Sequence, residues 1–228
     1  MSRGWFIVFG KAPRPGLVKT RLSPPLTLEQ SASLYREMLI DVLEASLGFA
    51  HSLDLEPVLA FHPPEAADEI LSCVPAGFRL HRQQGENLGQ RMANAFAEAA
   101  AAGAERILLR GSDSPAIGGA IFEQAMRFLD EAADIALAPD QGGGYAVVGM
   151  RSPHPAVFNP PMSTDRVLDQ TIRAAEAENL VVQLTEAVFD LDIVNDFGEF
   201  DALSEEVRLD LCARTFEAIS LLRSDGVL

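Results

Sequence analysis

The stretch Phe6-Ile-Val-Phe-Gly-Lys-Ala-Pro-Arg-Pro-Gly-Leu-Val-Lys-Thr-Arg-Leu22 begins as an apolar run and then breaks into a loop. Residues 5–9 are all apolar or aromatic, which predicts a short buried strand. The glycines and prolines that follow exclude regular structure and stiffen the loop. The loop carries four cations past the end of the strand: Lys11, Arg14, Lys19 and Arg21. Because ligands of open α/β sheets bind beyond the carboxyl ends of the strands, we expect this loop to border a binding crevice.

The charge of this loop is opposite to that of the chain. The 228 residues include 18 Lys and Arg against 33 Asp and Glu, a formal net charge of -15. A local reversal of sign attracts an anion, and a mixture of lysine and arginine suits a diphosphate. A solvated basic turn is the alternative interpretation. A P-loop is excluded because Val18, and not a glycine, precedes Lys19-Thr20.

Composition limits the class of protein. At this length, with 48% hydrophobic content, the chain is expected to form one domain over residues 1–228. An isoelectric point near 4.6 argues against a sequence-independent nucleic-acid binder, which needs an extended basic face. No apolar run has the length of a membrane span or of a signal-peptide core, so a cytoplasmic protein is expected. Cys73 and Cys212 lack neighbouring Cys or His at metal-ligand spacing and are predicted to be buried free thiols.

Strand-like and helix-like segments alternate along the chain. Thr27-Leu-Glu-Gln30 matches a capping box and predicts a long helix that ends near Gly48. Periodicity predicts further helices at residues 65–74, 88–102, 119–131, 164–177 and 205–222. It predicts further strands at residues 57–61, 78–82, 106–110, 135–138, 145–149, 180–184 and 188–191. This alternation indicates an α/β fold, a three-layer sandwich whose central sheet is mostly parallel and covered on both faces.

Two aspartates stand at the ends of predicted strands. Asp113 follows residues 107–109 in a Gly-Ser-Asp-Ser-Pro turn, and Asp192 ends the apolar segment that begins at Val188. Mg²⁺ typically takes one or two protein carboxylates and completes its shell with phosphate and water, so both residues are candidate catalytic metal ligands. The alternative for Asp113 is an Asx turn that only caps its own loop. Asp190 or Asp196 is a candidate cap for a helix that begins near residue 195.

Two glycine-containing loops are further candidates. The segment from Gln84 to Arg91 joins a strand to a helix, and its glycines allow a ligand to approach the backbone, although a plain connection is equally compatible. The run Gly142 to Gly144 is too permissive for a core element and suggests a loop that moves or lies against substrate.

Five motifs together resemble a known family. They are K-A-P-x-P-G-x-x-K-T-R-L at residues 11–22, Q-G-x-N-L-G-x-R at 84–91, G-S-D-S-P at 111–115, G-G-Y at 143–145 and D-x-D with a following Asp at 190–196. The chain resembles, over nearly its whole length, the bacterial GT-A-fold glycosyltransferases named for arsenosugar biosynthesis. It is more distantly similar to small nucleotidylyltransferases such as 2-phospholactate guanylyltransferase. The resemblance implies the nucleotide-diphospho-sugar transferase fold.

The resemblance also implies roles for individual residues. Asp113 would hold Mg²⁺ or Mn²⁺, with Asp192 as a second metal or substrate contact. The residues assigned to the nucleotide and its phosphates are Lys11, Arg14, Lys19, Arg21, Gln84, Gly85 and Gly89. Those assigned to the acceptor or its loop are Asp140, Gly143, Gly144, Tyr145, Ser163 and Thr164. The chain departs from the family pattern at Gly142, Met162 and Ile193, where the family has Asp, Trp and Thr, and Asp140 is a candidate to replace the missing carboxylate.

The expected activity is therefore metal-dependent transfer of a sugar from a nucleoside diphosphate sugar to a small-molecule acceptor. One alternative is a nucleotidylyltransferase that forms an activated compound from a nucleoside triphosphate. The same residues would serve both reactions. A second alternative is a nucleotide-binding protein without catalysis, because fold resemblance alone does not establish a reaction.

Overall fold

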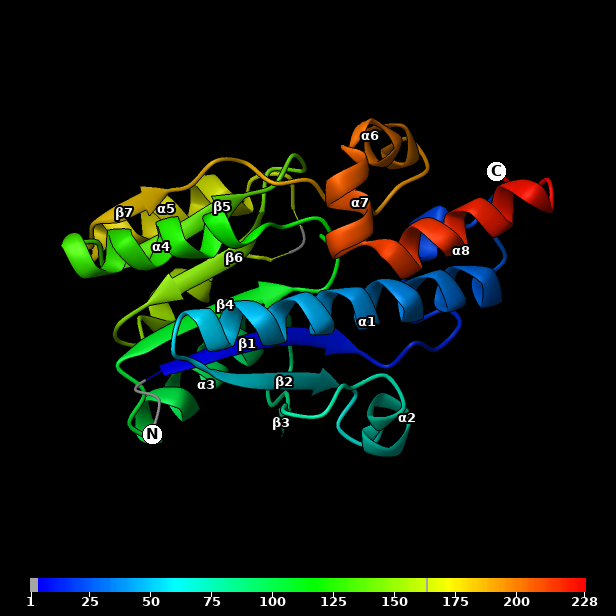
Figure 1. Ribbon diagram of the computed structural model, residues 1–228. Coiled ribbons are helices and arrows are strands. Elements are labelled where there is room, and N and C mark those ends of the chain that lie inside the picture. Colours follow the sequence, from blue (N-terminus) through cyan, green and yellow to red (C-terminus); the bar gives the residue numbers. More distant parts are fainter. Residues whose placement is uncertain (1–3, 163) are drawn as a thin grey trace.

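The computed structural model describes residues 4–162 and 164–228 (Figure 1). Its centre is a seven-stranded sheet of order β3-β2-β1-β4-β6-β5-β7. The strands are β1 (Gly4–Lys11), β2 (Glu56–His62), β3 (Arg79–Arg82), β4 (Arg106–Gly111), β5 (Ile135–Pro139), β6 (Tyr145–Met150) and β7 (Val182–Leu184). All neighbouring strands are parallel except where β6 pairs with β4 and β5. The predicted mostly parallel α/β sheet is confirmed.

Helices cover both faces of the sheet. They are α1 (Leu28–Ser52), α2 (Ala67–Leu71), α3 (Leu88–Ala101), α4 (Gly119–Glu131), α5 (Val167–Ala177), α6 (Asp196–Ala202), α7 (Glu205–Leu211) and α8 (Ala213–Ser224). Two short 3-10 helices lie at Thr20–Leu22 (η1) and Pro155–Phe158 (η2). The capping box predicted for α1 is present, since Thr27 Oγ1 accepts from Gln30 N and Gln30 Oε1 accepts from Thr27 N. In Figure 1, α1 and α4 lie in front of the sheet.

The alternation of side chains along β1 explains the three layers. Phe6 and Val8 are fully buried in the core that the sheet shares with α1 and α4. Trp5, Ile7 and Phe9 point the other way and pack in the core formed with α3, α5 and η2. A strand that is apolar at every position is therefore buried on both faces, as a central parallel strand must be.

The C-terminal helices form a third apolar cluster beyond the end toward which β1 points (Figure 1). Met38 of α1 and Phe200 of α6 are fully buried in this cluster, together with Ile219 of α8. The middle of α1 is joined to the start of α8 by Asp41, whose carboxylate accepts hydrogen bonds from Arg214 N (3.2 Å), Thr215 N (2.7 Å) and Thr215 Oγ1 (2.7 Å). This cap starts a new helix after Cys212, so the single helix expected over residues 205–222 is wrong. Two helices, α7 and α8, stand in its place.

One predicted strand is also absent from the sheet. In the segment expected as a strand at residues 188–191, a single bridge joins Val188 to Asp140, within the part of the chain that the structure describes. Beyond that bridge Leu191 N donates to Asp113 O at 3.0 Å, so the segment leaves β5 and crosses to the loop after β4. Asp190 and Asp192 are carried toward Asp113 as a result.

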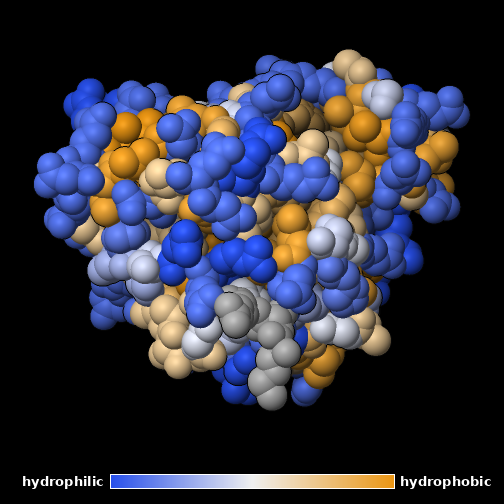
Figure 2. Space-filling view, turned by 60° about the vertical axis from the view of Figure 1, so that its left-hand side comes forward, coloured by the Kyte–Doolittle hydropathy of each residue, from blue (hydrophilic) through white to orange (hydrophobic). Residues whose placement is uncertain are grey.

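On the face drawn in Figure 2, hydrophilic side chains predominate, and hydrophobic side chains gather in groups on both sides of its upper part. Cys73 and Cys212 are both buried free thiols, as predicted. Among the described residues, none of the helices is long and apolar enough to cross a membrane.

Candidate functional site

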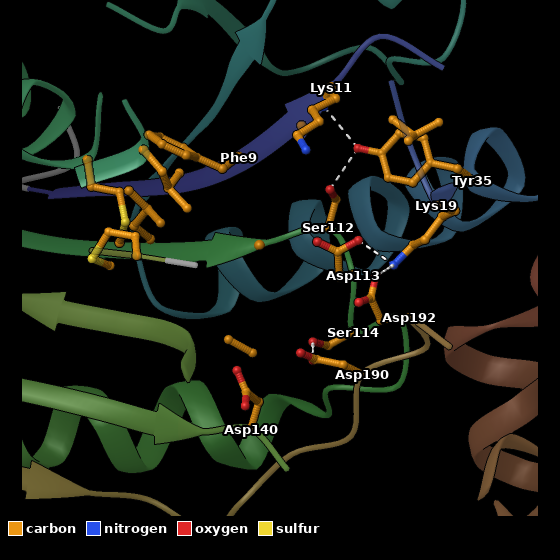
Figure 3. Close-up of a pocket in the computed structure, with 18 of the residues that line it drawn as sticks. Phe9, Lys11, Lys19, Tyr35, Ser112, Asp113, Ser114, Asp140, Asp190 and Asp192 are labelled. Atoms are coloured by element: carbon orange, nitrogen blue, oxygen red, sulfur yellow. Dashed lines mark hydrogen bonds and ion pairs between the residues drawn. The ribbon is translucent and has the colours of Figure 1, made fainter. Parts of the chain in front are cut away.

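A cavity of about 390 Å³ lies at the carboxyl ends of β1 and β4 (Figure 3). The charged residues expected to converge there do so, since its walls include Lys11, Lys19, Arg21, Asp113 and Asp192. The two loops that follow β1 and β4 meet because these strands are parallel neighbours, with Phe9 paired to Gly111. The roles assigned to these residues remain predictions, but their common location is a property of the fold.

Lys19 is the centre of the charged array. Its side chain is only 1% exposed, and its ammonium group forms ion pairs with Asp113 and with Asp192 Oδ1, the latter at 3.6 Å. Arg21 Nη1 contacts Asp192 Oδ2 at 2.7 Å. Removal from water raises the pKa of Asp113, but the neighbouring ammonium groups of Lys19 and Lys11 outweigh that effect and hold the pKa below its ordinary value. Asp113 is therefore ionised at neutral pH.

Tyr35 of α1 lies beside this array (Figure 3). Its hydroxyl accepts a hydrogen bond from Lys11 N at 2.9 Å and lies 2.8 Å from Ser112 Oγ. One buried group thus links the end of β1 to the turn that presents Asp113. Burial raises the pKa of Tyr35 above its ordinary value, so the group stays a neutral phenol.

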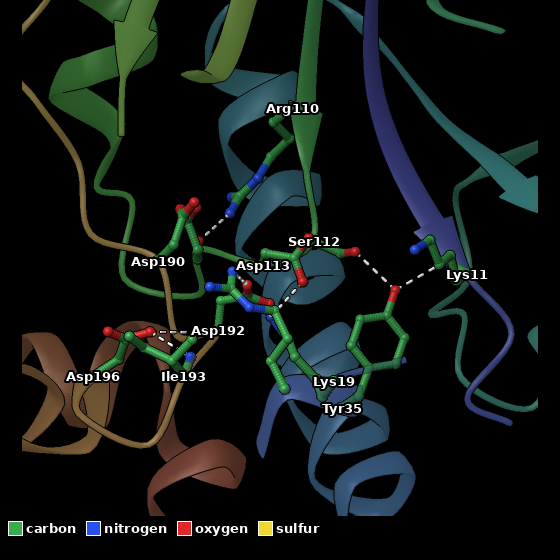
Figure 4. A network of polar contacts seen from close by, with 12 residues as sticks. Lys11, Lys19, Tyr35, Arg110, Ser112, Asp113, Asp190, Asp192, Ile193 and Asp196 are labelled. Carbon is green, nitrogen blue, oxygen red and sulfur yellow. Dashed lines mark hydrogen bonds and ion pairs between the residues drawn. The ribbon is translucent and has the colours of Figure 1, made fainter. Parts of the chain in front are cut away.

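Arg110 supports the same turn from inside the core (Figure 4). It is fully buried, and its guanidinium donates to Gly111 O at 3.1 Å and Ser114 O at 2.5 Å, while lying 5.5 Å from the centre of the Phe122 ring. Burial lowers the pKa of Arg110 to about 10, which leaves it charged at neutral pH. Two carbonyls of the Gly111–Ser114 turn are therefore fixed by a charged donor, although nothing in the local sequence marks Arg110 as part of a site.

Asp190 and Asp196, the other aspartates of residues 190–196, accept different hydrogen bonds. Asp190 accepts a short hydrogen bond from Ser114 Oγ, and burial raises its pKa to about 6. Asp196 Oδ2 accepts from Asp192 N at 2.6 Å and Ile193 N at 2.7 Å (Figure 4). Asp196 therefore holds the turn that leads into α6. The helix-capping role considered for Asp190 or Asp196 is wrong, because α6 begins after Asn195 without a side-chain cap.

A second cavity of about 800 Å³ adjoins the first, and both are lined by Asp140, Tyr145, Asp190 and Asp192. Its walls also include Thr164, and Arg21 is the one Lys or Arg found there among the described residues. Ser163, which was assigned with Thr164, lies outside the described residues.

The glycine loop is held against this second cavity by Asp140. Asp140 Oδ1 accepts from Gly142 N at 2.7 Å and Gly144 N at 2.8 Å. At Gly143, φ is +83° and a Cβ atom would lie 2.0 Å from Asp165 O, so a side chain cannot be accommodated. Asp140 therefore acts here as the acceptor that shapes the loop, in addition to lining both cavities.

Several predicted nucleotide contacts lie elsewhere. Arg14 turns toward α2, where its Nε and Nη2 atoms contact Glu69 at 2.8 and 2.6 Å, so it does not line the cavity. The wall after β3 contains Gln83 in place of Gln84, because the Gln83 amide donates to Gly10 O and Ala60 O and turns inward.

The two glycines of that loop are also outside the cavity wall. Gly85 has a φ of +134°. At Gly89, a Cβ atom would lie 2.1 Å from Phe158 O. Gly89 is therefore required for close packing of α3 against η2, and this explains a glycine that the sequence suggested for ligand approach.

A divalent cation would need oxygen ligands from the carboxylates of this cavity. No group of three His, Cys, Asp or Glu side chains within residues 4–162 and 164–228 is arranged to hold a metal ion. Asp113 and Asp192, however, both contact the ammonium group of Lys19, so their carboxylates face a common point. This fits the mode in which Mg²⁺ takes one or two carboxylates and completes its shell with phosphate and water.

Solved structures share this architecture. A "putative nucleotide-diphospho-sugar transferase" from Desulfovibrio desulfuricans G20 is similar with a TM-score of 0.85 and 28% identity, over 98% of each chain. A cytidylyltransferase from Leptospira borgpetersenii has a TM-score of 0.58 and 12% identity, over 99% of this chain and 96% of that one. A CMP:2-keto-3-deoxy-manno-octonic acid synthetase complexed with CTP has a TM-score of 0.55 and 11% identity, over 88% and 98%. The α/β fold is thus the one expected, that of nucleotide-diphospho-sugar transferases. The sequence of residues 48–164 matches DUF2064, described as an uncharacterized protein conserved in bacteria, and the chain belongs to this family.

Proposed function

We propose that this protein is a glycosyltransferase that uses a nucleoside diphosphate sugar as donor. The observation that carries the proposal is the meeting of Lys11, Lys19, Arg21, Asp113 and Asp192 in one cavity beyond the carboxyl ends of two parallel strands. A metal diphosphate needs charges of both signs close together, and this cavity provides them. The similarity to the Desulfovibrio desulfuricans protein supports the same class of substrate.

The two adjoining cavities support a reaction between two substrates. The cations lie mainly in the smaller cavity, which would take the nucleotide phosphates, and the larger cavity would take the acceptor. The acceptor oxygen would attack the anomeric carbon of the sugar, and the bond from that carbon to the diphosphate would break with its electrons on the leaving oxygen. Asp190 lines both cavities and is the carboxylate to which we assign the acceptor's proton.

Electrostatic stabilisation of the leaving diphosphate would be the main catalytic effect of the chain. Lys19 and Arg21 already lie beside the carboxylates and would contact the phosphate oxygens as negative charge develops. Asp113 and Asp192 would hold Mg²⁺ or Mn²⁺, which supplies further neutralisation of the diphosphate when it is bound.

Asp113→Asn tests the proposal most directly, because asparagine keeps the size and local hydrogen bonding but removes the charge. Nucleotide sugars and nucleoside triphosphates are titrated into both proteins at fixed Mn²⁺ and again in chelator. We expect the variant to lose most of the metal-dependent gain in affinity and to keep the metal-independent part. Asp201→Asn is the matched control, since the exposed Arg223 is the one side chain with which Asp201 pairs in the part of the chain that the structure describes. An equal metal-dependent gain in wild type and Asp113→Asn would contradict the assigned role.

Product analysis separates this proposal from its alternative. Slow release of a nucleoside diphosphate from one nucleotide sugar is expected for the glycosyltransferase. Release of pyrophosphate from a nucleoside triphosphate would instead indicate a nucleotidylyltransferase, in which a substrate phosphate attacks the α-phosphate. Nucleotide binding without turnover of either compound would contradict both reactions.

A further inference from the structure

The cations of the smaller cavity differ in whether they are neutralised. Lys19 and Arg21 are ion-paired with Asp113 and Asp192. Lys11 and Arg91 line the same cavity, and neither has a carboxylate within ion-pair distance among the residues that the structure describes. Because the chain has 33 Asp and Glu, two cations of one cavity without acidic partners among the described residues require an explanation.

Arg91 is partly buried in the first turn of α3, and burial lowers its pKa. Its Nε atom is buried and has no hydrogen-bond acceptor among the described residues. A buried donor without an acceptor costs free energy, and the cost is larger for a charged group. Arg91 also lines the cavity, so an anionic ligand there would supply the opposite charge that the guanidinium lacks among the described residues. Its place in the first turn of a helix adds to the preference for negative charge.

Lys11 lies on the same side of the cavity. It ends β1, and its neighbour across the sheet is His62, the last residue of β2. Burial lowers the pKa of His62, and the charges of Arg91 and Lys11 lower it further, while Glu65 opposes them. Both cations are thus close to one imidazole, and the field on this side of the cavity is positive.

We propose that Lys11 and Arg91 form an anion subsite for a phosphoryl group, beside the charged array of Lys19, Arg21, Asp113 and Asp192 in the same cavity. The subsite rests on the proposed function only in naming the nucleotide as the source of that phosphate. That Lys11 and Arg91 lack acidic partners among the described residues is an observation of the structure and does not depend on the proposed function. Arg91 then becomes a binding residue, and the phosphate chain extends from Lys19 toward the start of α3.

Inorganic pyrophosphate is the probe, titrated calorimetrically in chelator so that metal does not contribute. Arg91→Gln and Lys11→Gln are each expected to weaken binding at least tenfold. Arg14→Gln is the matched control, because this cation of the same basic loop is paired with Glu69 and faces away from the cavity. The affinity of Arg14→Gln for pyrophosphate should stay within twofold of that of the wild type. Wild-type affinity in Arg91→Gln, or an equal loss in Arg14→Gln, would overturn the subsite.

Melting of the ligand-free proteins shows whether Arg91 is instead structural. Because the charge of Arg91 has no acidic partner within residues 4–162 and 164–228, Arg91→Gln should melt at or above the wild-type temperature. Arg91→Lys should recover part of the pyrophosphate affinity. A clear fall in the melting temperature of Arg91→Gln, without recovery of affinity by lysine, would mean that the residue serves the fold.

Competition identifies the source of the anion. Mutual exclusion of pyrophosphate and the nucleotide that binds would assign the subsite to the nucleotide phosphates, as proposed, whereas simultaneous binding would overturn that assignment.

The subsite and the proposed function can fail independently of each other. Pyrophosphate binding that depends on Arg91, without turnover of any nucleotide, leaves the subsite in place. Turnover with an unchanged KM for the nucleotide substrate in Arg91→Gln removes the subsite and leaves the function.

Discussion

Lys19 is a buried lysine that holds two carboxylates together. Its backbone is in the left-handed region, with φ of 48° and ψ of 34°, and its side chain is almost fully buried. A buried ammonium group needs compensation, and Asp113 and Asp192 provide it. The carboxylates in turn would repel one another without a cation between them. In the ligand-free protein, Lys19 therefore keeps two acidic residues in position for an incoming metal or substrate.

Asp190 should make folding stability depend on pH. Its folded-state pKa of about 6 exceeds the ordinary value of 3.8 because of burial, so the folded protein binds a proton more tightly than the unfolded chain. Stability is then lost as the pH rises from about 4 to 6, by up to about 3 kcal/mol. Asp190→Asn keeps the acceptor for Ser114 Oγ and removes this loss.

The measurement is chemical denaturation in chelator at several pH values. We expect the stability of Asp190→Asn relative to wild type to increase between pH 4 and pH 7. The exposed Asp201→Asn serves as the control, and its relative stability should change little over that range. A constant difference between Asp190→Asn and wild type across the range would show that Asp190 has an ordinary pKa.

At the residue scale, sequence patterns identified groups at strand ends and missed groups that act through contacts distant in sequence. Lys19, Arg21 and Asp113 follow apolar strands, and their meeting could be expected from a parallel sheet. The partner of Arg14 could not be predicted from the sequence, because Glu69 lies 55 residues away on α2. Tyr35 was missed for the same reason, since it lies 77 residues from Ser112 and looks like one more apolar position of α1.

Elements of the site are joined to each other by single buried groups, and Tyr35 is the clearest example. Removing its hydroxyl in Tyr35→Phe leaves Lys11 N and Ser112 Oγ without this partner. We expect a loss of about 1 to 2 kcal/mol in the free energy of unfolding. A double-mutant cycle with Ser112→Ala should show a coupling of about 0.5 kcal/mol or more. Additive single effects would mean that α1 does not connect β1 and β4 through this hydroxyl.

Asp41 has the corresponding role for α8. Asp41→Ala would leave the Arg214 and Thr215 amides and the Thr215 hydroxyl without their acceptor. Since buried donors without acceptors are costly, we expect a loss of about 1 to 3 kcal/mol, measured by urea denaturation. Asp201→Ala, which breaks only an ion pair at the surface, should cost less than about 1 kcal/mol. Equal losses in the two variants would contradict the assignment of Asp41 as the cap of α8.

The contacts of Asp41 and Leu191 show where prediction of elements from sequence ends. Apolar periodicity placed the central strands and the helices on both faces, because those segments bury regular stripes of side chains. It joined α7 and α8 into one helix because the interruption at Cys212 depends on Asp41, 171 residues earlier than Cys212 in the chain. It placed a strand at residues 188–191 because an apolar alternation does not reveal that Leu191 bonds to the loop after β4.

At the scale of the whole molecule, the site draws on distant parts of the chain. The smaller cavity takes residues from the loop after β1, from α1, from the start of α3, from the turn after β4 and from residues 190–192. The three apolar clusters adjoin one another through β1 and α1, whose side chains contribute to more than one of them. A ligand that spans the cavity should therefore stabilise the chain as one cooperative unit.

Thermal unfolding tests whether the chain unfolds cooperatively and whether it binds a nucleotide. A ligand at about 100 times its Kd adds roughly 2.7 kcal/mol of stability. For a chain of this size, about 1 kcal/mol raises Tm by roughly 2 to 4 °C, so the correct nucleotide with Mn²⁺ should raise Tm by about 5 to 10 °C. The whole transition should move without splitting, because segments from β1 through residue 192 contribute to the same wall. A second transition that stays at the ligand-free temperature would show that part of the chain folds independently. A screen of nucleotides and nucleotide sugars in which nothing shifts Tm would instead contradict the nucleotide site.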